Sequence, residues 1–272
     1  PRRPLRPGRT APTPYPNPSR RRMMQQGSLP PELTATRSPE LSPTLLAQLA
    51  REMQLQLSPQ QCAQLIAYAT LLQRWNRVHN LTAISDSHAV LTHHLLDSLA
   101  IVGPLEQAMT QYASALKHER EQLHFLDAGT GAGLPGVPLA IARPSWHGTL
   151  VDAVQKKCAF LQQVRIELHL ANVTVHHARL ESSGLKRHEL IVSRAFTSLG
   201  EFVARTQCLL RPHGLWAAMK GRHRAQESAD LPPGVELLEV ITLRVPMLRE
   251  QRHLVILRQR GMPSASAAIA KP

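Results

Sequence analysis

A glycine-rich turn in the middle of the chain has the residue types and the spacing of a ligand-binding site. Over residues 123–136 an apolar stretch leads into a turn and then into the start of a helix. Glycines let the backbone approach a ligand closely, and a helix start offers unpaired N–H donors. Gly131, Gly133 and Gly136 spell G-x-G-x-x-G, a spacing typical of dinucleotide binding. The turn therefore predicts a nucleotide-like ligand.

An acid in front of the first glycine favours a cationic ligand over a pyrophosphate. Asp127, Gly129, Gly131 and Gly133 spell D-x-G-x-G-x-G, which resembles the S-adenosylmethionine loop of Rossmann-like methyltransferases. A carboxylate here suits a ligand that carries a sulfonium and an ammonium group, whereas it would repel a pyrophosphate. An NAD-dependent oxidoreductase stays open on the first spacing, although the chain has no Tyr-x-x-x-Lys pair for that chemistry.

Three more residues are spaced to hold the nucleoside part of such a ligand. Asp152 closes the second predicted strand, 23 residues after Gly129, where an acid can accept hydrogen bonds from both ribose hydroxyls. Leu180 and Glu181 follow the third predicted strand and could flank an adenine ring, the first below the ring and the second at its amine. The alternatives are a surface acid at a strand end and an ordinary loop pair.

The end of the fourth predicted strand, residues 191–196, is where a methyl acceptor would sit. It lacks the N/D-P-P-Y/F loop used for exocyclic amines and the Pro-Cys nucleophile used for pyrimidine carbons. It offers Arg194, with Lys220 ending the fifth strand and Arg222 and Arg224 behind it. We predict Arg194 and Lys220 as catalytic, Arg194 also at the cofactor, and Lys220, Arg222 and Arg224 on RNA. A structural ion pair is the alternative role for Arg194.

Basic residues without an acid–base pair suit an acceptor that already has a free lone pair. Guanine N7 is such an acceptor, because it takes a methyl group without losing a proton, and positioning then supplies most of the catalysis.

The histidines and cysteines do not have the spacing of a metal site, so we predict no metal. They are two histidine pairs and three widely separated cysteines: His93-His94, His176-His177, Cys62, Cys158 and Cys208. His94 and Asp97 fall on one helix face, which favours a local side-chain network. The cysteines indicate buried thiols in a reducing compartment, with Cys208 in the core.

The net charge of the chain favours an acidic partner, and its hydropathy does not indicate a membrane span. The 272 residues carry a net charge of +13. Seven arginines in residues 1–22 supply +7 of it, so the rest of the chain carries +6. Such a balance fits nucleic acid. No apolar run approaches the ~20 residues of a membrane span. We expect a monomeric, cytoplasmic protein.

The chain divides into four parts. Residues 1–42 hold ten prolines and few apolar residues, so we predict a disordered arm. The arm could bind RNA, or it could be an organelle transit peptide. We favour a third interpretation, in which the coding start has been placed too early and Met23 or Met24 is the true first residue. Residues 43–122 suit a helical cap, residues 123–260 a ligand-binding domain, and residues 261–272 a disordered tail.

Apolar periodicity predicts the elements of the cap and the domain. In the cap, helices are predicted over 44–57, 58–77 and 87–102, with Ser58 to Gln61 as a capping box and a helix or connector over 105–122. In the domain, strands over 123–126, 148–152, 173–176, 189–193 and 215–219 alternate with helices over 134–142, 155–169 and 198–210, and 235–245 pairs with 253–258. This alternation predicts an α/β fold, a mostly parallel twisted sheet with helices on both faces and an antiparallel edge hairpin.

Seven short motifs follow one another in the order of a known family. They are Trp75-Asn76, Asn80-Leu81-Thr82, His94-x-Leu96-Asp97-Ser98, residues 127–138, Ser193-Arg194-Ala195-Phe196, Met219-Lys220-Gly221 and Arg252-His253-Leu254-Val255. Over residues 45–258 the chain resembles bacterial small-subunit ribosomal RNA methyltransferase G, also called glucose-inhibited division protein B. Two positions depart from the family pattern, His93 where members often carry Arg and Ala132 where they often carry Pro.

This resemblance implies a Rossmann-like class I methyltransferase that uses S-adenosylmethionine to methylate N7 of one guanine in 16S rRNA, as free rRNA or in a small-subunit particle. The family's cofactor positions would fall on Gly129, Leu134, Leu180, Glu181 and Arg194. Another RNA site, a ribose 2′-hydroxyl, and a non-catalytic RNA-binding module stay open as alternatives.

Overall fold

The structure is a computed structural model of the chain. It describes residues 41–113, 116, 122–182, 184–194, 196, 198–221 and 230–261, all of them in the unit Ser38–Pro272. Nearly all of the predicted arm and tail, together with Arg222 and Arg224, therefore lies outside the described residues. Within this described part, no helix has the length and apolar character that crossing a membrane requires.

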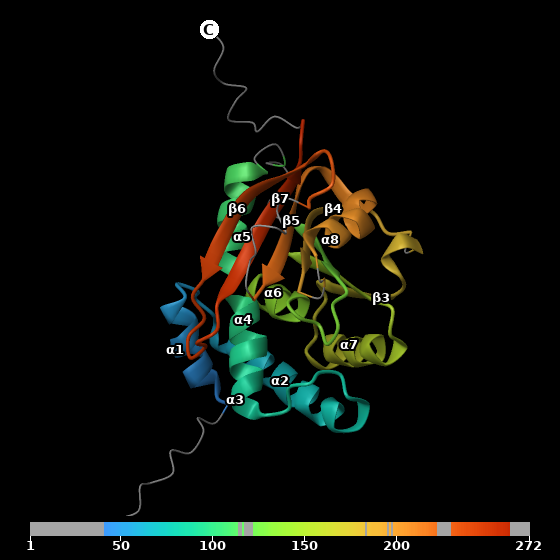
Figure 1. The fold of residues 1–272 in the computed structure, drawn as a ribbon. Coiled ribbons are helices and arrows are strands. Elements are labelled where there is room, and N and C mark those ends of the chain that lie inside the picture. The colour runs from blue at the N-terminus through green and yellow to red at the C-terminus, as the bar shows by residue number, and fades with distance from the viewer. Residues whose placement is uncertain are drawn as a thin grey trace, which may run out of the picture. The chain divides into compact units, whose positions relative to one another are not determined.

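Seven strands form one sheet in the order β3-β2-β1-β4-β5-β7-β6 (Figure 1). They are β1 His124–Ala128, β2 His147–Asp152, β3 Val173–His177, β4 His188–Ser193, β5 Leu210–Lys220, β6 Val235–Leu243 and β7 Arg252–Gln259. β1 to β5 pair in parallel, and β7 runs antiparallel to both β5 and β6. The prediction of a mostly parallel sheet with an antiparallel edge hairpin is confirmed.

Both faces of the sheet are covered, as the central strand β4 illustrates. All six of its residues are buried, which is typical of a parallel strand covered on both faces. Alternate side chains of a strand point to opposite faces, so Leu190 and Val192 join one hydrophobic cluster and Ile191 joins the other. Helices α6 Gly136–Ala142 and α7 Gln155–Glu167 contribute to the first cluster, and α8 Leu199–Thr206 to the second.

The cap packs on the first of these faces. It comprises α1 Pro43–Glu52, α2 Pro59–His79, α3 Ser87–Val90, α4 Asp97–Leu99 and α5 Val102–Tyr112. Leu72 and Leu95 of the cap share their buried cluster with Leu139 and Leu190 of the sheet region. The division into a separate cap and domain stays a prediction.

The local signals at the helix ends have mixed outcomes. The capping box at α2 is confirmed, since Ser58 Oγ accepts from Gln61 N at 3.2 Å and Gln61 Oε1 accepts from Ser58 N at 2.8 Å. The first helix ends at Glu52, well before the predicted residue 57, because Gln54 adopts a left-handed backbone with φ of 59°.

Predicted helix 87–102 contains a change of helix type. Between α3 and α4 the chain forms a π-helix over Leu91–Leu96. Such wide turns are rare and occur frequently at functional sites. The apolar pattern did not reveal this segment, which carries His93 and His94.

The prediction that Cys208 lies in the core is wrong. α8 ends at Thr206, and the tighter 3₁₀ turn Gln207–Leu209 that follows carries Cys208, which is exposed. The change from α to 3₁₀ geometry alters the side-chain directions, so the helical phase used for the prediction no longer applies. Cys62 and Cys158 are buried free thiols, as predicted.

Candidate functional site

The glycine turn follows β1 at the carboxyl end of the parallel strands. Gly129, Gly131 and Gly133 have positive φ angles of 69°, 62° and 96°, a conformation that other residues rarely adopt. A Cβ atom on Gly133 would also lie 2.7 Å from the side chains of Leu161 and Val137. The turn thus requires glycine for its backbone conformation and for close packing against the helices.

Asp127 ties the two ends of this turn together. Its Oδ2 atom accepts from Thr130 Oγ1 at 2.6 Å and from the Gly136 N–H at 2.8 Å. Its Oδ1 atom is buried and has no hydrogen-bond partner among the described residues. Burial raises the pKa of this carboxyl to about 6, although the two hydrogen bonds lower it. Asp127 is fully buried and is not among the described residues that line the cavities below, so its direct contact with a cationic ligand stays a prediction.

A cavity of about 310 Å³ opens beside the turn and the end of β2. Residues predicted from the sequence line it, namely Gly129, Asp152 and Leu180, together with Phe196 and Arg205. This size falls in the range of small-molecule sites, about 300–1,000 Å³. The cavity accordingly suits the nucleoside part of a ligand, and three predicted cofactor residues lie together in its wall.

Asp152 does more than line this cavity. Its Oδ2 accepts from the Gly131 N–H at 2.9 Å, and its Oδ1 accepts from the Val154 N–H at 2.8 Å. The amino group of Lys157 lies 3.6 Å from Oδ2. A carboxylate oxygen can accept more than one hydrogen bond, so Asp152 can fix the glycine turn and still receive ribose hydroxyls.

Six of the nine predicted cofactor residues are not among those that line this cavity: Asp127, Gly131, Gly133, Leu134, Glu181 and Arg194. Arg194 lines the second cavity described below. Glu181 is exposed and paired with Arg205, which lowers the pKa of Glu181, and Arg205 in turn lies 5.5 Å from the ring centre of Phe196. Leu134 is buried in the hydrophobic cluster shared with the cap. Neither is among the residues that line the cavity in the described part of the chain.

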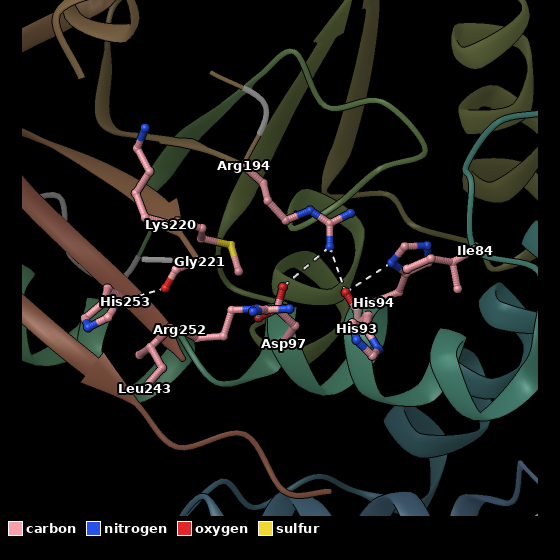
Figure 2. A pocket seen from close by; sticks show the side chains of 11 residues that line it. Ile84, His93, His94, Asp97, Arg194, Lys220, Gly221, Leu243, Arg252 and His253 are labelled. Carbon is pink, nitrogen blue, oxygen red and sulfur yellow. Dashed lines mark hydrogen bonds and ion pairs between the residues drawn. The ribbon is translucent and has the colours of Figure 1, made fainter. Parts of the chain in front are cut away.

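A second cavity, of about 350 Å³, lies where the π-helix faces the ends of β4, β5 and β7 (Figure 2). Arg194 and Lys220, both predicted as catalytic, line it together with His93, His94, Asp97 and Arg252. Figure 2 shows the guanidinium of Arg194 directed towards the π-helix: Nη1 donates to the His93 carbonyl at 2.9 Å and lies 3.5 Å from Asp97 Oδ2. The structure thus brings two predicted site residues from different strands to one cavity.

Asp97 receives a second arginine on its other oxygen. Arg252 Nε donates to Asp97 Oδ1 at 3.1 Å. Burial raises the pKa of Asp97, and the two guanidinium groups act in the opposite direction. One buried carboxylate of the cap therefore holds Arg194 at the end of β4 and Arg252 at the start of β7.

His94 is neutral at physiological pH. Burial, followed by the charge of Arg194, lowers its pKa to about 4. Its Nδ1 lies 3.1 Å from the His93 carbonyl, which can only accept, and its Nε2 lies 3.0 Å from Thr82 Oγ1. The proton therefore sits on Nδ1, and Nε2 accepts from the Thr82 hydroxyl. His94 thus bonds to Thr82 and His93, whereas Asp97 bonds to Arg194 and Arg252, so the contacts of the predicted pair run to other residues.

Lys220 lies apart from this network. Its amino group donates to the Phe196 carbonyl at 3.3 Å, and in Figure 2 it extends away from Asp97. Arg222 and Arg224 lie outside the described residues, so their role on RNA stays a prediction. Among the residues described, no group of three or more His, Cys, Asp or Glu side chains could hold a metal ion.

Several residues of the site were not singled out by their chemistry in the sequence. Arg252 appeared only within a motif, and His94 and Asp97 were predicted only as a local side-chain network. Tyr68 was missed altogether; it is fully buried in α2, and its hydroxyl donates to the Ala132 carbonyl at 2.7 Å, which links the cap to the glycine turn. A tyrosine on an otherwise apolar helix face was the only available signal.

Comparison with known proteins gives consistent matches along most of the chain. The family model described as rRNA small subunit methyltransferase G matches residues 61–255. A protein named ribosomal RNA small subunit methyltransferase G from Methylibium petroleiphilum is 44% identical over 216 residues, covering 79% of this chain and 94% of that protein. One of the same name from Aromatoleum aromaticum is 45% identical over 224 residues, covering 80% of this chain and all of that protein.

Solved structures give a weaker likeness. A SAM-dependent methyltransferase from Aquifex aeolicus is 16% identical, with a TM-score of 0.40, over 57% of this chain and 95% of that one. At this level the likeness has no bearing on the site.

Proposed function

The chain belongs to the rRNA small subunit methyltransferase G family, and we propose that it transfers the methyl group of S-adenosylmethionine to N7 of a guanine in 16S rRNA. The observation that carries the proposal is that residues two positions apart in the chain line the two cavities. Phe196 lines the cavity beside Asp152, and Arg194, two residues earlier, lines the cavity beside Asp97. A methyl donor in the first cavity and a base in the second would therefore both lie beside the chain that follows β4.

The residues of the first cavity fit the donor. Gly129 leaves space at the turn, Leu180 offers an apolar wall, and Asp152 offers a carboxylate for the ribose. Asp127 is not among the residues that line this cavity, but its carboxyl lies behind the glycine turn, where negative charge favours a ligand with positive charge. When bound, S-adenosylmethionine supplies an electrophilic methyl group on a sulfonium sulfur.

The second cavity fits an acceptor that needs no general base. His94 is neutral with both ring nitrogens engaged, and the Asp97 carboxylate is shared by two arginines. Guanine N7 attacks with its own lone pair, so the new N–CH₃ bond forms as the S–CH₃ bond breaks and no proton is removed. The ring gains a positive charge, and Asp97 offsets the positive charge of Arg194 beside it.

We assign binding roles to the other polar residues, because the proposed reaction needs no general base. Arg194 faces the cofactor or a phosphate, and Lys220, with Arg222 and Arg224, holds the RNA backbone. A ribose 2′-hydroxyl is the alternative acceptor, and that reaction would need Lys220 in a base system because the hydroxyl must lose its proton.

Transfer of a labelled methyl group from S-adenosylmethionine tests the proposal. Free 16S rRNA, assembled small-subunit particles and an assembly intermediate would be assayed in parallel, followed by nucleoside analysis. We expect the label in 7-methylguanosine with at least one of the three substrates. Label in a 2′-O-methylated nucleoside would replace N7 by the ribose acceptor, and no label in any rRNA would overturn the proposal.

A further inference from the structure

We propose that a basic surface at the junction of α2 and α7 binds the phosphate backbone of the RNA that flanks the methylated base. We call it the α2–α7 surface, and it comprises Arg74, Arg77, Val78, Val154 and Lys156. The proposal rests on the proposed function, since it adds a second RNA contact to the residues beyond β5.

Positive charge on this surface is not balanced locally. Residues 74–84 and 153–166 contain no Asp or Glu. Arg74, Arg77 and Lys156 are exposed, and in the described chain none of them lies within ion-pair distance of an acid. Their neighbour Lys157 differs, because it is paired with Asp152. Three cations are thus available to phosphates.

The two helices are tied together at this surface. Lys156 Nζ donates to the carbonyl of His79, the last residue of α2, at 2.7 Å. Below them, the ring of Trp75 in α2 packs 5.6 Å from the ring of Phe160 in α7. Arg74, Arg77 and Val78 are spaced i, i+3 and i+4, so they share one helix face. A preorganised surface loses less entropy when it binds a ligand.

Apolar side chains lie among these cations. Val78 is 74% exposed and Val154 is 39% exposed, and they are two of the five large apolar side chains that the described structure leaves exposed. A free inorganic anion would leave them in water. Nucleic acid presents phosphates together with the apolar faces of its sugars and bases, so it matches both features of the surface.

The surface adjoins the first cavity. Asp152 and Ala153 line that cavity, and Val154 and Lys156 follow them directly in the chain. Lys220 lies on the second cavity. RNA that places its base in the second cavity could therefore be held on two sides, at the end of β5 and on the α2–α7 surface.

A triple substitution, Arg74→Ala with Arg77→Ala and Lys156→Ala, tests the proposal in the full chain. The control removes three other exposed cations, Arg51, Arg165 and Arg260, and so makes the same change in net charge. Both variants would be assayed for binding to small-subunit particles without S-adenosylmethionine, for methylation rate across salt concentrations, and for S-adenosylmethionine affinity by calorimetry.

We expect the surface variant to bind particles roughly tenfold more weakly and to lower the slope of log affinity against log salt by about 2, since each lost phosphate contact removes about 0.7. Turnover at saturating particles and S-adenosylmethionine affinity should stay at the wild-type values. The control should bind within about twofold of wild type. If the triple variant does not fold, Arg77→Glu against Arg165→Glu replaces the pair.

Equal effects of the surface and control variants would overturn the proposal. The binding measurement does not depend on which atom is methylated. Failure of the N7 assignment would therefore leave this test intact, and failure of the surface would leave the N7 assignment intact.

Discussion

The carboxylate of Asp97 in the cap and the guanidinium of Arg194 after β4 lie 3.5 Å apart. This ion pair connects the cap to the carboxyl end of strand β4, where the site lies. Arg252 joins it from β7 at 3.1 Å. The three residues come from distant parts of the sequence and meet in one cavity. Asp97 therefore positions Arg194, the residue expected to act at the cofactor or at a phosphate.

Asp97→Asn should lower turnover by roughly 10- to 100-fold, because Arg194 and Arg252 lose the charge that orients them. Stability should also fall, because Arg194 and Arg252 would keep partly buried charges without their acidic partner. Steady-state methylation and denaturant unfolding would be compared for wild type and variant. A large loss of stability with unchanged turnover would show that Asp97 has only a structural role.

Arg194 and Lys220 should give different kinetic signatures although they line the same cavity. Arg194→Ala should depress turnover at saturating RNA, whereas Lys220→Ala should mainly raise the RNA concentration needed for half-maximal rate. Rates over a range of particle concentrations would separate the two effects. If Lys220→Ala lowered turnover and left half-saturation unchanged, Lys220 would belong to the chemistry instead of RNA binding.

Asp152→Ala should weaken S-adenosylmethionine binding by about 2–3 kcal/mol, because the ribose hydroxyls lose a charged acceptor. Part of this loss comes from the turn, since Asp152 also accepts from the Gly131 N–H. Asp152→Asn keeps the shape and one acceptor oxygen, so it should lose less. Calorimetry would compare the three proteins, and an unchanged affinity in Asp152→Ala would remove this residue from the site.

His188, at the start of β4, should make stability depend on pH. Burial, followed by the charges of His124 and Arg211, lowers its pKa from 6.5 to about 4. Between these pH values the unfolded chain binds a proton that the folded chain does not, so the free energy of unfolding falls as the pH is lowered. This residue alone should contribute up to about 3 kcal/mol to that fall.

His188→Gln should remove this contribution, whereas His177→Gln, at an exposed position, should keep it. Denaturant unfolding from about pH 7 to about pH 4 would measure the difference. Parallel stability curves for wild type and His188→Gln would show that His188 does not titrate as its burial indicates.

The elements that were predicted correctly are those whose pattern depends on local chemistry. β4 was recognised from the apolar residues 190–192 at its centre, which are buried, and the start of α2 because Ser58 and Gln61 cap each other. The π-helix was not predicted, since its apolar residues have the spacing of an α-helix. Its consequence, the placement of His93 and His94 at the cavity, was hidden for the same reason.

Contacts between distant residues explain the remaining differences. The pairing of Asp97 with Arg252 depends on how the cap packs against the last strands, and no short-range pattern encodes it. Glu181 fits an adenine-binding position by spacing, but Arg205 from α8 pairs with it in the fold. The residue types of the site can be read from the sequence, whereas tertiary packing decides which of these residues come into contact.

Borohydride reduction followed by aniline, which cuts RNA at 7-methylguanine, tests the central claim most directly. 16S rRNA from small-subunit particles treated with the protein and S-adenosylmethionine should be cut at one guanine. The same rRNA should stay intact when either component is omitted. If the rRNA gains a methyl group from the protein and resists the cut, N7 is not the acceptor.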